Sequence, residues 1–292
     1  MIIVRLIGGL GNQMFQYAIG RSLAYRLNTE LKLDISYFER NTLRQYHLFP
    51  FNIIQNFATL DDLNRVRKSY FVRLKSPIQL LKDTLNREIP IIPITERFVD
   101  FDPEILNLPD NVYLNGYWQS EKYFKDIEEI IRNEFRIKIP PDPFNKKIGE
   151  QIQYEESVSI HVRRGDYVSD PETNQAHGVC NIEYYQKAVN EIITRVNNPQ
   201  FYLFSDDPDW AKANITAPAP IVFITQKDWT KSYEDLRLMS LCKHHIIANS
   251  SFSWWGAWLA KNEGQIVIAP SKWFTTIKWN YADRLPPDWM IL

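Results

Sequence analysis

The chain has 292 residues, of which 45% are hydrophobic and 24% are charged, values typical of a globular protein with one or two domains. Its 34 basic and 35 acidic residues give a formal net charge of −1, so the basic excess expected of a nucleic-acid-binding protein is lacking. No apolar run approaches the ~20 residues that a membrane-spanning helix needs, and the two cysteines have neither metal-ligand nor disulfide-framework spacing, which favours a reducing cytoplasm.

The first forty residues predict a strand, a glycine-rich turn, a helix and a second strand. Residues 2–7 form an apolar run that only Arg5 interrupts, as expected of a buried parallel strand. The glycine-rich turn follows at residues 8–13, and apolar side chains then recur at helical spacing from Met14 to Leu27. Residues 31–35 are the second predicted strand.

The segment 40–101 has no clear pattern, because short amphipathic pieces such as residues 60–74 alternate with prolines. Helices and loops are expected there. A regular unit returns at residues 112–120, and a helix is predicted over 121–135. Three prolines between positions 140 and 143 cannot continue a helix, so residues 139–143 are the candidate linker.

Strands and helices alternate after this linker. The predicted strands are 157–162, 201–204, 221–224, 245–248 and 266–269, and the predicted helices are 182–196, a short one near Pro208, 233–241 and 252–261. This alternation is typical of a parallel doubly wound sheet. We therefore expect an α/β protein with two Rossmann-like domains, residues 1–140 and 141–292, facing a cleft; the extreme C-terminus is free to pack back on the first domain.

The segment His161-Val162-Arg163-Arg164-Gly165-Asp166 begins in a predicted strand and continues into the following loop. Loops beyond the carboxyl ends of parallel strands line the ligand crevice of open α/β sheets. The planar fork of Arg matches phosphate oxygens bidentately, so two adjacent arginines suggest a diphosphate. The alternative is a solvated Arg-Arg turn in which Asp166 is only an ion-pair partner.

The glycine-rich turn at 8–13 is neither a dinucleotide fingerprint nor a P-loop, since the third glycine of the former and the Gly-Lys-Ser/Thr of the latter are missing. Gly9 and Gly11 would let backbone N–H groups approach a ligand at the start of a helix, and Asn12 adds a polar side chain. The alternative is that these glycines serve tight packing alone.

Ser205, Asp206 and Asp207 follow the predicted strand 201–204. The carboxylates could bind a metal on a nucleotide diphosphate, or they could accept hydrogen bonds from ribose hydroxyls or base N–H groups. The arginine pair argues against a metal, because cationic side chains can neutralise a leaving diphosphate. A third interpretation is that Ser205 or Asp206 caps the next helix.

Asn249, Ser250, Ser251 and Phe252 likewise join a predicted strand to a helix. Asn-Ser-Ser is good N-cap chemistry, and the same geometry offers hydroxyl and N–H groups to an anion. The three strand-end loops, at 163–166, 205–207 and 249–252, would converge at one edge of one sheet. They predict a nucleotide-diphosphate site without a metal ion.

Taken together, residues 8–18, 161–167, 204–207 and 249–256 resemble the bacterial α-1,2-fucosyltransferases of glycosyltransferase family 11, as does the segment 117–124. The resemblance implies a GT-B-type fold in which GDP-L-fucose binds mainly the C-terminal domain and a β-galactoside-terminated glycan mainly the N-terminal domain. It implies inverting transfer of L-fucose to the 2-hydroxyl of the galactoside, with no metal and no other cofactor. Such a cytoplasmic enzyme could contact the inner face of the membrane peripherally.

The resemblance also implies residue roles. Arg163 would bind the β-phosphate and stabilise the departing GDP, and His161 and Asp166 would shape the donor site. Asn12 would lie near the transferred sugar. The remaining donor-site candidates are Gly9, Gly11, Ser205, Asp206, Asp207, Asn249, Ser250, Ser251 and Phe252.

The general base is not identified by the sequence. Asp34 and Asp166 are candidates, and a structural ion pair is an equal alternative for each. Two other functions stay open: fucosyl transfer to another position or acceptor, and a carbohydrate- or nucleotide-sugar-binding protein without turnover.

Overall fold

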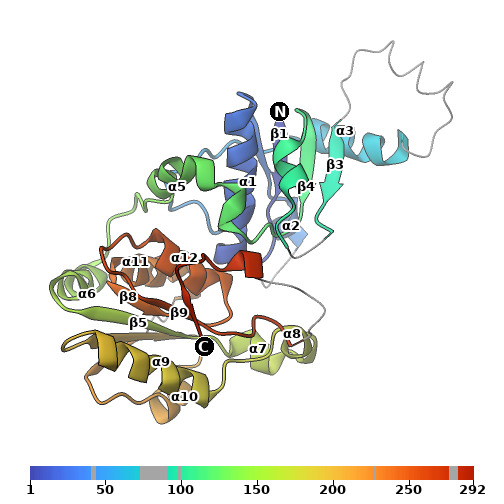
Figure 1. The fold of residues 1–292 in the computed structure, drawn as a ribbon. Coiled ribbons are helices and arrows are strands. Elements are labelled where there is room, and N and C mark those ends of the chain that lie inside the picture. Colours follow the sequence, from blue (N-terminus) through green and yellow to red (C-terminus); the bar gives the residue numbers. More distant parts are fainter. Residues whose placement is uncertain (41–43, 73–90, 98–99, 226–227, 276–281) are drawn as a thin grey trace. The chain divides into compact units, whose positions relative to one another are not determined.

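A computed structural model describes residues 1–40, 44–72, 91–97, 100–225, 228–275 and 282–292 (Figure 1). The chain forms two compact units, Met1–Arg136 and Ile137–Leu292, and each unit contains a parallel sheet flanked by helices. The predicted α/β class is confirmed, and two such sheets in one chain are the components of a GT-B-type protein.

The first unit is built on four parallel strands in the order β2-β1-β4-β3. The strands are β1 (Ile2–Arg5), β2 (Leu31–Asp34), β3 (Ile92–Thr95) and β4 (Val112–Asn115). The helices are α1 (Leu10–Arg26), α2 (Ser36–Arg40), α3 (Leu60–Val72) and α5 (Glu128–Glu134), with 3₁₀ turns η1 (Pro103–Asn107), η2 (Glu121–Tyr123) and η3 (Lys125–Ile127).

Both faces of this sheet are covered, which explains the apolar run in β1. Helix α1 packs closely on one face, since a Cβ at Gly20 would lie 3.0 Å from atoms of Val4 and Leu31. On the other face, Val66 of α3 joins a buried cluster with Ile3 and Tyr113. Close helix packing therefore depends on a small residue inside α1.

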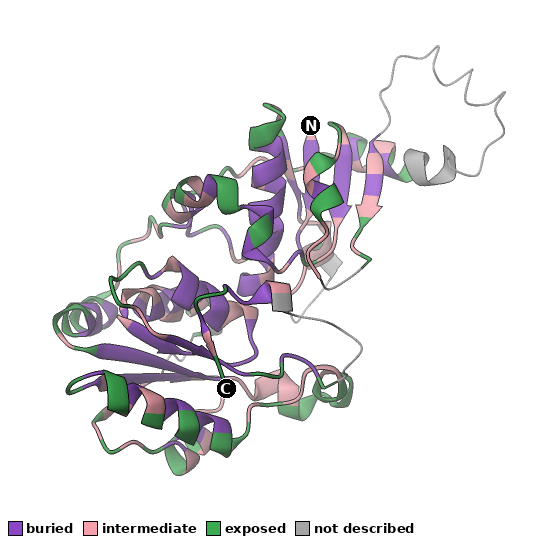
Figure 2. Cartoon of the chain, viewed as in Figure 1, coloured by how far each residue is buried: buried purple, intermediate pink, exposed green. Residues whose placement is uncertain are grey.

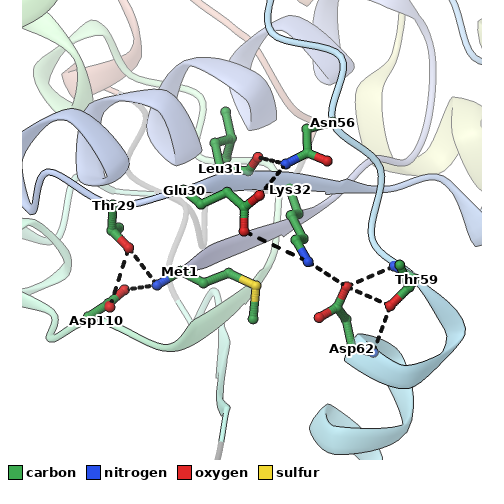
Figure 3. A network of polar contacts seen from close by, with 9 residues as sticks. All are labelled: Met1, Thr29, Glu30, Leu31, Lys32, Asn56, Thr59, Asp62 and Asp110. Carbon is green, nitrogen blue, oxygen red and sulfur yellow. Dashed lines mark hydrogen bonds and ion pairs between the residues drawn. The ribbon is translucent and has the colours of Figure 1, made fainter.

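A polar network attaches the start of α3 to the edge strand β2 (Figure 3). The Asp62 carboxylate accepts hydrogen bonds from the backbone N of Thr59 (2.9 Å), the Thr59 hydroxyl (2.8 Å) and Nζ of Lys32 (2.9 Å). Burial acts to raise the pKa of Asp62, but these hydrogen bonds outweigh it and lower the pKa. The ionised carboxylate thus fixes the helix to the sheet.

The second unit contains six parallel strands in the order β10-β9-β8-β5-β6-β7. The strands are β5 (Ser157–Val162), β6 (Gln200–Ser205), β7 (Ile221–Ile224), β8 (His244–Ile246), β9 (Val267–Ala269) and β10 (Met290–Ile291). The helices are α6 (Pro143–Tyr154), α7 (Gly165–Ser169), α8 (Pro171–His177), α9 (Ile182–Arg195), α10 (Pro208–Asn214), α11 (Ser232–Leu241) and α12 (Ser251–Leu259), with 3₁₀ turns η4 (Trp229–Lys231) and η5 (Ala282–Arg284).

Two apolar cores sandwich this sheet, and the central strand β5 is buried along its whole length (Figure 2). Helices α9 and α10 lie on one face and α6, α11 and α12 on the other (Figure 1). Val158 and Ile160 point into the first core, whereas Tyr202 and Phe204 of the neighbouring strand point into the second. Because both faces of a parallel sheet are buried in this way, the sequences of its strands are nearly continuous apolar runs.

Several elements differ from the sequence-based expectation. The helix predicted over 121–135 is wrong in its first half, where η2 and η3 stand in place of an α-helix because buried Tyr123 and Phe124 anchor an irregular backbone. Strand β3 was not predicted; its Pro93 is tolerated because β3 is an edge strand. Pro77 and Pro90, which together with Pro93 interrupt the pattern of the segment 40–101, lie outside the described residues.

The candidate linker is shorter than predicted, since Pro143 is already the first residue of α6 and Asp142 caps that helix by accepting a hydrogen bond from the backbone N of Asn145 at 2.9 Å. Helices α6, α7 and α8 were not predicted. The other predicted elements of this unit lie within two residues of their expected bounds. The last residues form β10, which pairs with β9 in the second sheet.

Candidate functional site

Three predicted site loops follow adjacent strands of the second sheet. Strand β5 lies between β8 and β6, and all three run parallel. Their carboxyl ends therefore bring residues 163–166, 205–207 and 249–252 to one edge of the sheet, the position at which open α/β sheets bind ligands.

Arg163 is held between two carboxylates at this edge. Its Nη2 lies 2.5 Å from Oδ1 of Asp166, and its Nη1 lies 2.8 Å from Oδ2 of Asp206. Burial acts to lower the pKa of the Arg163 guanidinium, but Asp206 and Asp166 outweigh burial and raise it. The two partners differ in accessibility, because the Asp166 side chain is 30% exposed and that of Asp206 only 8%.

Arg164 has partners of its own. Its Nε lies 3.0 Å from Oδ2 of Asp207, its guanidinium stacks over the ring of Trp210 at 4.0 Å, and its backbone N donates to Oδ1 of Asp206 at 2.7 Å. Gly165 follows, where a Cβ would lie 2.6 Å from Oδ2 of Asp206. Arg164 is thus fixed against α10, and a larger residue at 165 would disturb the Asp206 carboxylate.

The net charge of this cluster differs from that of an arginine pair without carboxylates. Two guanidiniums, of Arg163 and Arg164, pair with three carboxylates, of Asp166, Asp206 and Asp207. Two positive and three negative charges leave a formal charge of −1. An anion can therefore bind Arg163 only by competing with one of its carboxylates, and Asp166 is the accessible one.

His161 supplies a neutral, buried group next to the cluster. Burial first, and then the charge of Arg163, lower the pKa of His161 to about 3. Its Nδ1 is buried without a hydrogen-bond partner, and its ring lies 5.7 Å from that of Phe252. An uncharged imidazole of this kind can exchange hydrogen bonds with a polar ligand without adding charge.

The Ser205-Asp206-Asp207 loop caps α10 as one alternative expected, but the prediction that Ser205 or Asp206 is the cap is wrong, because Asp207 occupies the N-cap position. Asp207 caps α10 by accepting a hydrogen bond from the backbone N of Trp210 at 3.2 Å, and the Ser205 hydroxyl accepts one from the backbone N of Asp207 at 3.0 Å. Asp206 instead bridges Arg163 and the Arg164 backbone. The loop therefore holds the arginines in place.

The loop at 249–252 combines two buried residues, Asn249 and Ser250, with two half-buried ones, Ser251 and Phe252. Nδ2 of buried Asn249 donates to the backbone O of His177 at 3.0 Å, which ties β8 to the end of α8. Ser250 caps α12, since its hydroxyl accepts a hydrogen bond from the backbone N of Phe252 at 3.3 Å, as its N-cap chemistry predicted. Ser251 is half-buried at the first turn of that helix.

Three residues near this edge were not singled out from the sequence. Tyr167 lies under Arg163, with 5.4 Å from the guanidinium to the ring, and stacks on His177 at 4.8 Å between ring centroids. In the first turn of α11, Oδ1 of Asp235 is buried without a hydrogen-bond partner, and burial followed by the charge of Glu234 raises the pKa of Asp235 to about 7. Tyr167 directly follows the motif 161–166, which could have drawn attention to it, whereas no strand-end motif marks His177 or Asp235.

The remaining predicted residues belong to the first unit. Gly9 is the N-cap of α1 and its backbone O accepts hydrogen bonds from the backbone N of Asn12 and of Gln13. Gly11 lies in the first turn of α1. The Asn12 side chain accepts a hydrogen bond from Nε2 of Gln119 at 2.7 Å, so it contacts the loop after β4.

Asp34 has a structural environment. It is buried at the end of β2, where its carboxylate accepts hydrogen bonds from the Tyr113 hydroxyl at 2.7 Å and from the backbone N of Ser36 at 2.9 Å. These hydrogen bonds, rather than the ion pair considered as its alternative, favour a structural role for Asp34 over a role as general base.

The described residues lack two features that other functions would require. Among the residues that the structure describes, no three His, Cys, Asp or Glu side chains are grouped so that they could hold a metal ion. Within that same part of the chain, no helix combines the length and apolarity needed to span a bilayer.

Comparison with known proteins decides the family. The model of the family described as Glycosyl transferase family 11 matches residues 1–291. The chain belongs to glycosyltransferase family 11. The family predicted from the motifs is therefore confirmed, and with it the assignment as a glycosyltransferase.

Two relatives of this family 11 protein match nearly its whole length. The "Alpha-1,2-colitosyltransferase" of Escherichia coli is 35% identical over 99% of this chain and 98% of that protein. The "O-antigen biosynthesis glycosyltransferase WbnK" of Escherichia coli is 34% identical over 92% of this chain and 93% of its own. A crystal structure of NodZ alpha-1,6-fucosyltransferase soaked with GDP-fucose aligns over 88% of this chain and 91% of that one, with 15% identity and a TM-score of 0.48.

Proposed function

We propose that this family 11 enzyme transfers L-fucose from GDP-L-fucose to the 2-hydroxyl of a terminal β-galactoside, forming an α-1,2 linkage with inversion and without a metal ion. The observation that carries the proposal is the cluster around Arg163, which presents a charged guanidinium at the ligand-binding edge of the second sheet. The α-1,2 linkage is supported by the name of the 35% identical relative.

The donor would bind at this edge through its nucleotide diphosphate. Arg163 would hold the β-phosphate, and the N-terminus of α12, with Ser250, Ser251 and Phe252, would face the same anion. His161 would contact an uncharged part of the donor, because its low pKa keeps it neutral at physiological pH. Asp206 would act as the positioning residue that orients Arg163.

The chemistry follows from the charge that develops as the bond between sugar and phosphate breaks. The sugar becomes oxocarbenium-like, the β-phosphate becomes an anion, and Arg163 is oriented to stabilise that anion before reaction begins. Loss of one such preorganised donor slows turnover by roughly 10²–10³-fold in comparable sites. The acceptor hydroxyl attacks from the opposite face and gives its proton to a base, for which the partly exposed Asp166 is the candidate.

A second donor deserves a direct test, because the 35% identical relative is named an alpha-1,2-colitosyltransferase. Colitose is the 3-deoxy counterpart of fucose, so the two donors differ by one hydroxyl group. A site that hydrogen-bonds this hydroxyl would reject the deoxy sugar by roughly 10⁴-fold, whereas a site that leaves it in solvent would accept both. Competition between GDP-fucose and GDP-colitose for one acceptor separates these cases.

The decisive experiment measures GDP release from GDP-L-fucose with lactose and other galactosides, with and without EDTA, and determines the product linkage by NMR. We expect EDTA-resistant turnover and an α-1,2 product. Another linkage would change the acceptor assignment, and activity abolished by EDTA would exclude the metal-free mechanism. GDP-fucose binding without turnover on any acceptor would favour the non-catalytic alternative.

A further inference from the structure

The loop after β4 has an unusual backbone that the donor site does not explain. Trp118 has a φ of +55°, a left-handed conformation that is uncommon for a bulky residue. Its side chain is buried and meets the ring of Tyr123 edge-on at 5.8 Å. Strained conformations of this kind persist only where neighbouring groups enforce them, and they concentrate at functional sites.

Two elements hold this loop, which we call the Tyr117 turn (Gly116, Tyr117 and Trp118). The Glu96 carboxylate, just after β3, accepts hydrogen bonds from the backbone N of Tyr117 at 2.6 Å and of Trp118 at 2.9 Å. From α1, Nε2 of buried Gln16 donates to the backbone O of Gly116 at 3.0 Å. A Cβ at Gly116 would lie 2.4 Å from Cβ of Glu96, so only glycine allows the backbone of the turn to lie this close to the Glu96 side chain.

The turn buries one aromatic ring and presents the next. Tyr117 is 43% exposed although it adjoins fully buried Trp118. The pKa of Tyr117 is raised by partial burial and by Tyr37 and Glu96, while Arg44 and Arg5 act to lower it. The charges of Glu96, Arg44 and Arg5 therefore act on the Tyr117 hydroxyl.

The surrounding polar groups lie at the carboxyl edge of the first sheet. Arg5 ends β1 and its Nη1 donates to Oδ1 of Asn115 at the end of β4, at 3.3 Å. Arg44 lies beside the glycine-rich turn, since a Cβ at Gly9 would be 3.7 Å from its Nη1. The amide pair formed by Gln119 and Asn12 adjoins the turn on the same edge.

An exposed aromatic ring on a fixed backbone, near guanidinium, carboxylate and amide groups, matches the chemistry of a sugar. Sugar rings offer an apolar C–H face for an aromatic ring and hydroxyls for the polar groups around it. We propose that the Tyr117 turn is the acceptor platform, on which the ring of Tyr117 stacks against the terminal galactoside and Glu96 fixes the position of that ring. The proposal rests on the proposed function, because it specifies where that reaction's acceptor binds.

The test compares Tyr117→Ala with Tyr117→Phe in the full chain. We expect Tyr117→Ala to raise the KM for lactose about tenfold, a change typical of a lost aromatic contact, and Tyr117→Phe to raise it less than about threefold because the ring remains. The KM for GDP-fucose and the Kd for GDP stay at the wild-type values in both. Tyr25→Ala removes a 55% exposed ring from the last turns of α1 and serves as the matched control, with no change expected.

The role of Glu96 is tested separately as a positioning residue. Glu96→Ala removes both hydrogen bonds to the turn, and we expect the KM for lactose to rise as in Tyr117→Ala while the Kd for GDP is unchanged. A general folding defect would instead weaken GDP binding and lactose binding together, and would overturn the positioning role.

Failure of this inference differs from failure of the proposed function. An active wild-type enzyme whose Tyr117→Ala variant keeps the KM for lactose overturns the platform. A wild-type protein that transfers no fucose overturns the proposed function instead, and the platform is then tested by saturation-transfer NMR with lactose. Loss of that signal in Tyr117→Ala alone supports the platform, and an equal signal in both proteins, or none in the wild type, overturns it.

Discussion

Replacing Asp166 by Asn should strengthen GDP binding, although Asp166 lies in the centre of the proposed donor site. In the free protein the Asp166 carboxylate forms an ion pair with Nη2 of Arg163. The five charged groups of the cluster carry a formal charge of −1. A diphosphate must displace this carboxylate or bind beside it. Asp166→Asn removes the competing charge and keeps the shape of the side chain.

The magnitude follows from Coulomb's law. Two unit charges ~6 Å apart at an effective dielectric constant of about 20 interact by about 3 kcal/mol. Asp166 is 30% exposed, so solvent screening reduces the expected repulsion to about 1 kcal/mol. This corresponds to about a fivefold lower Kd for GDP.

Asp206→Asn is the matched control, because it removes one negative charge from the same guanidinium. Asp206 is buried and also accepts the hydrogen bond from the Arg164 backbone, so its charge positions the cluster. We expect this variant to weaken GDP binding and to lose about 2 kcal/mol of unfolding free energy, as when a buried ion pair is broken.

Isothermal titration calorimetry with GDP, thermal unfolding and steady-state kinetics test both variants. If Asp166 is the general base, its replacement lowers kcat while GDP binding becomes tighter. Weaker GDP binding by Asp166→Asn would refute the competition argument, and tighter binding by both variants would show that charge alone, without positioning by Asp206, controls affinity.

Three further predictions concern Arg163, the Lys32–Asp62 pair and the Tyr117 turn. Arg163→Lys should lower kcat by roughly 10²-fold, because an ammonium cannot reproduce a bidentate fork, and near-wild-type turnover would contradict the phosphate role. Asp62→Asn should reduce the free energy of unfolding in urea at pH 7, since the lowered pKa of Asp62 means that its ionised form stabilises the fold above the unfolded pKa of about 3.9. As the pH falls below about 4, wild type and variant should converge, and a pH-independent difference would contradict the Lys32–Asp62 argument. Gly116→Ala should lower the unfolding free energy by about 1–3 kcal/mol through overlap with Glu96, and an unchanged Tm would show that the turn can relax.

The second half of the fold could be predicted because its strands are short apolar runs between helices of clear periodicity. β3 could not, since Pro93 is acceptable only at a sheet edge and the strand order that makes β3 an edge is a long-range property. The helix predicted over 121–135 failed for a related reason. Tyr123 and Phe124 have helical spacing with later apolar residues, but their burial in the first unit fixes a 3₁₀ backbone.

The sequence by itself determined the family, the α/β class and the loops that carry polar residues beyond strand ends, because motif residues and apolar periodicity are local properties. Only the tertiary structure decided the electrostatics. Asp206 and Asp207 are more than 40 residues from the arginines along the chain, and the parallel pairing of β5 with β6 makes them ion-pair partners. The sequence around Arg163 and Arg164 therefore resembles a cationic site, whereas the fold surrounds the two guanidiniums with three carboxylates. Asp206 is buried among these, and Asp166 and Asp207 are partly exposed.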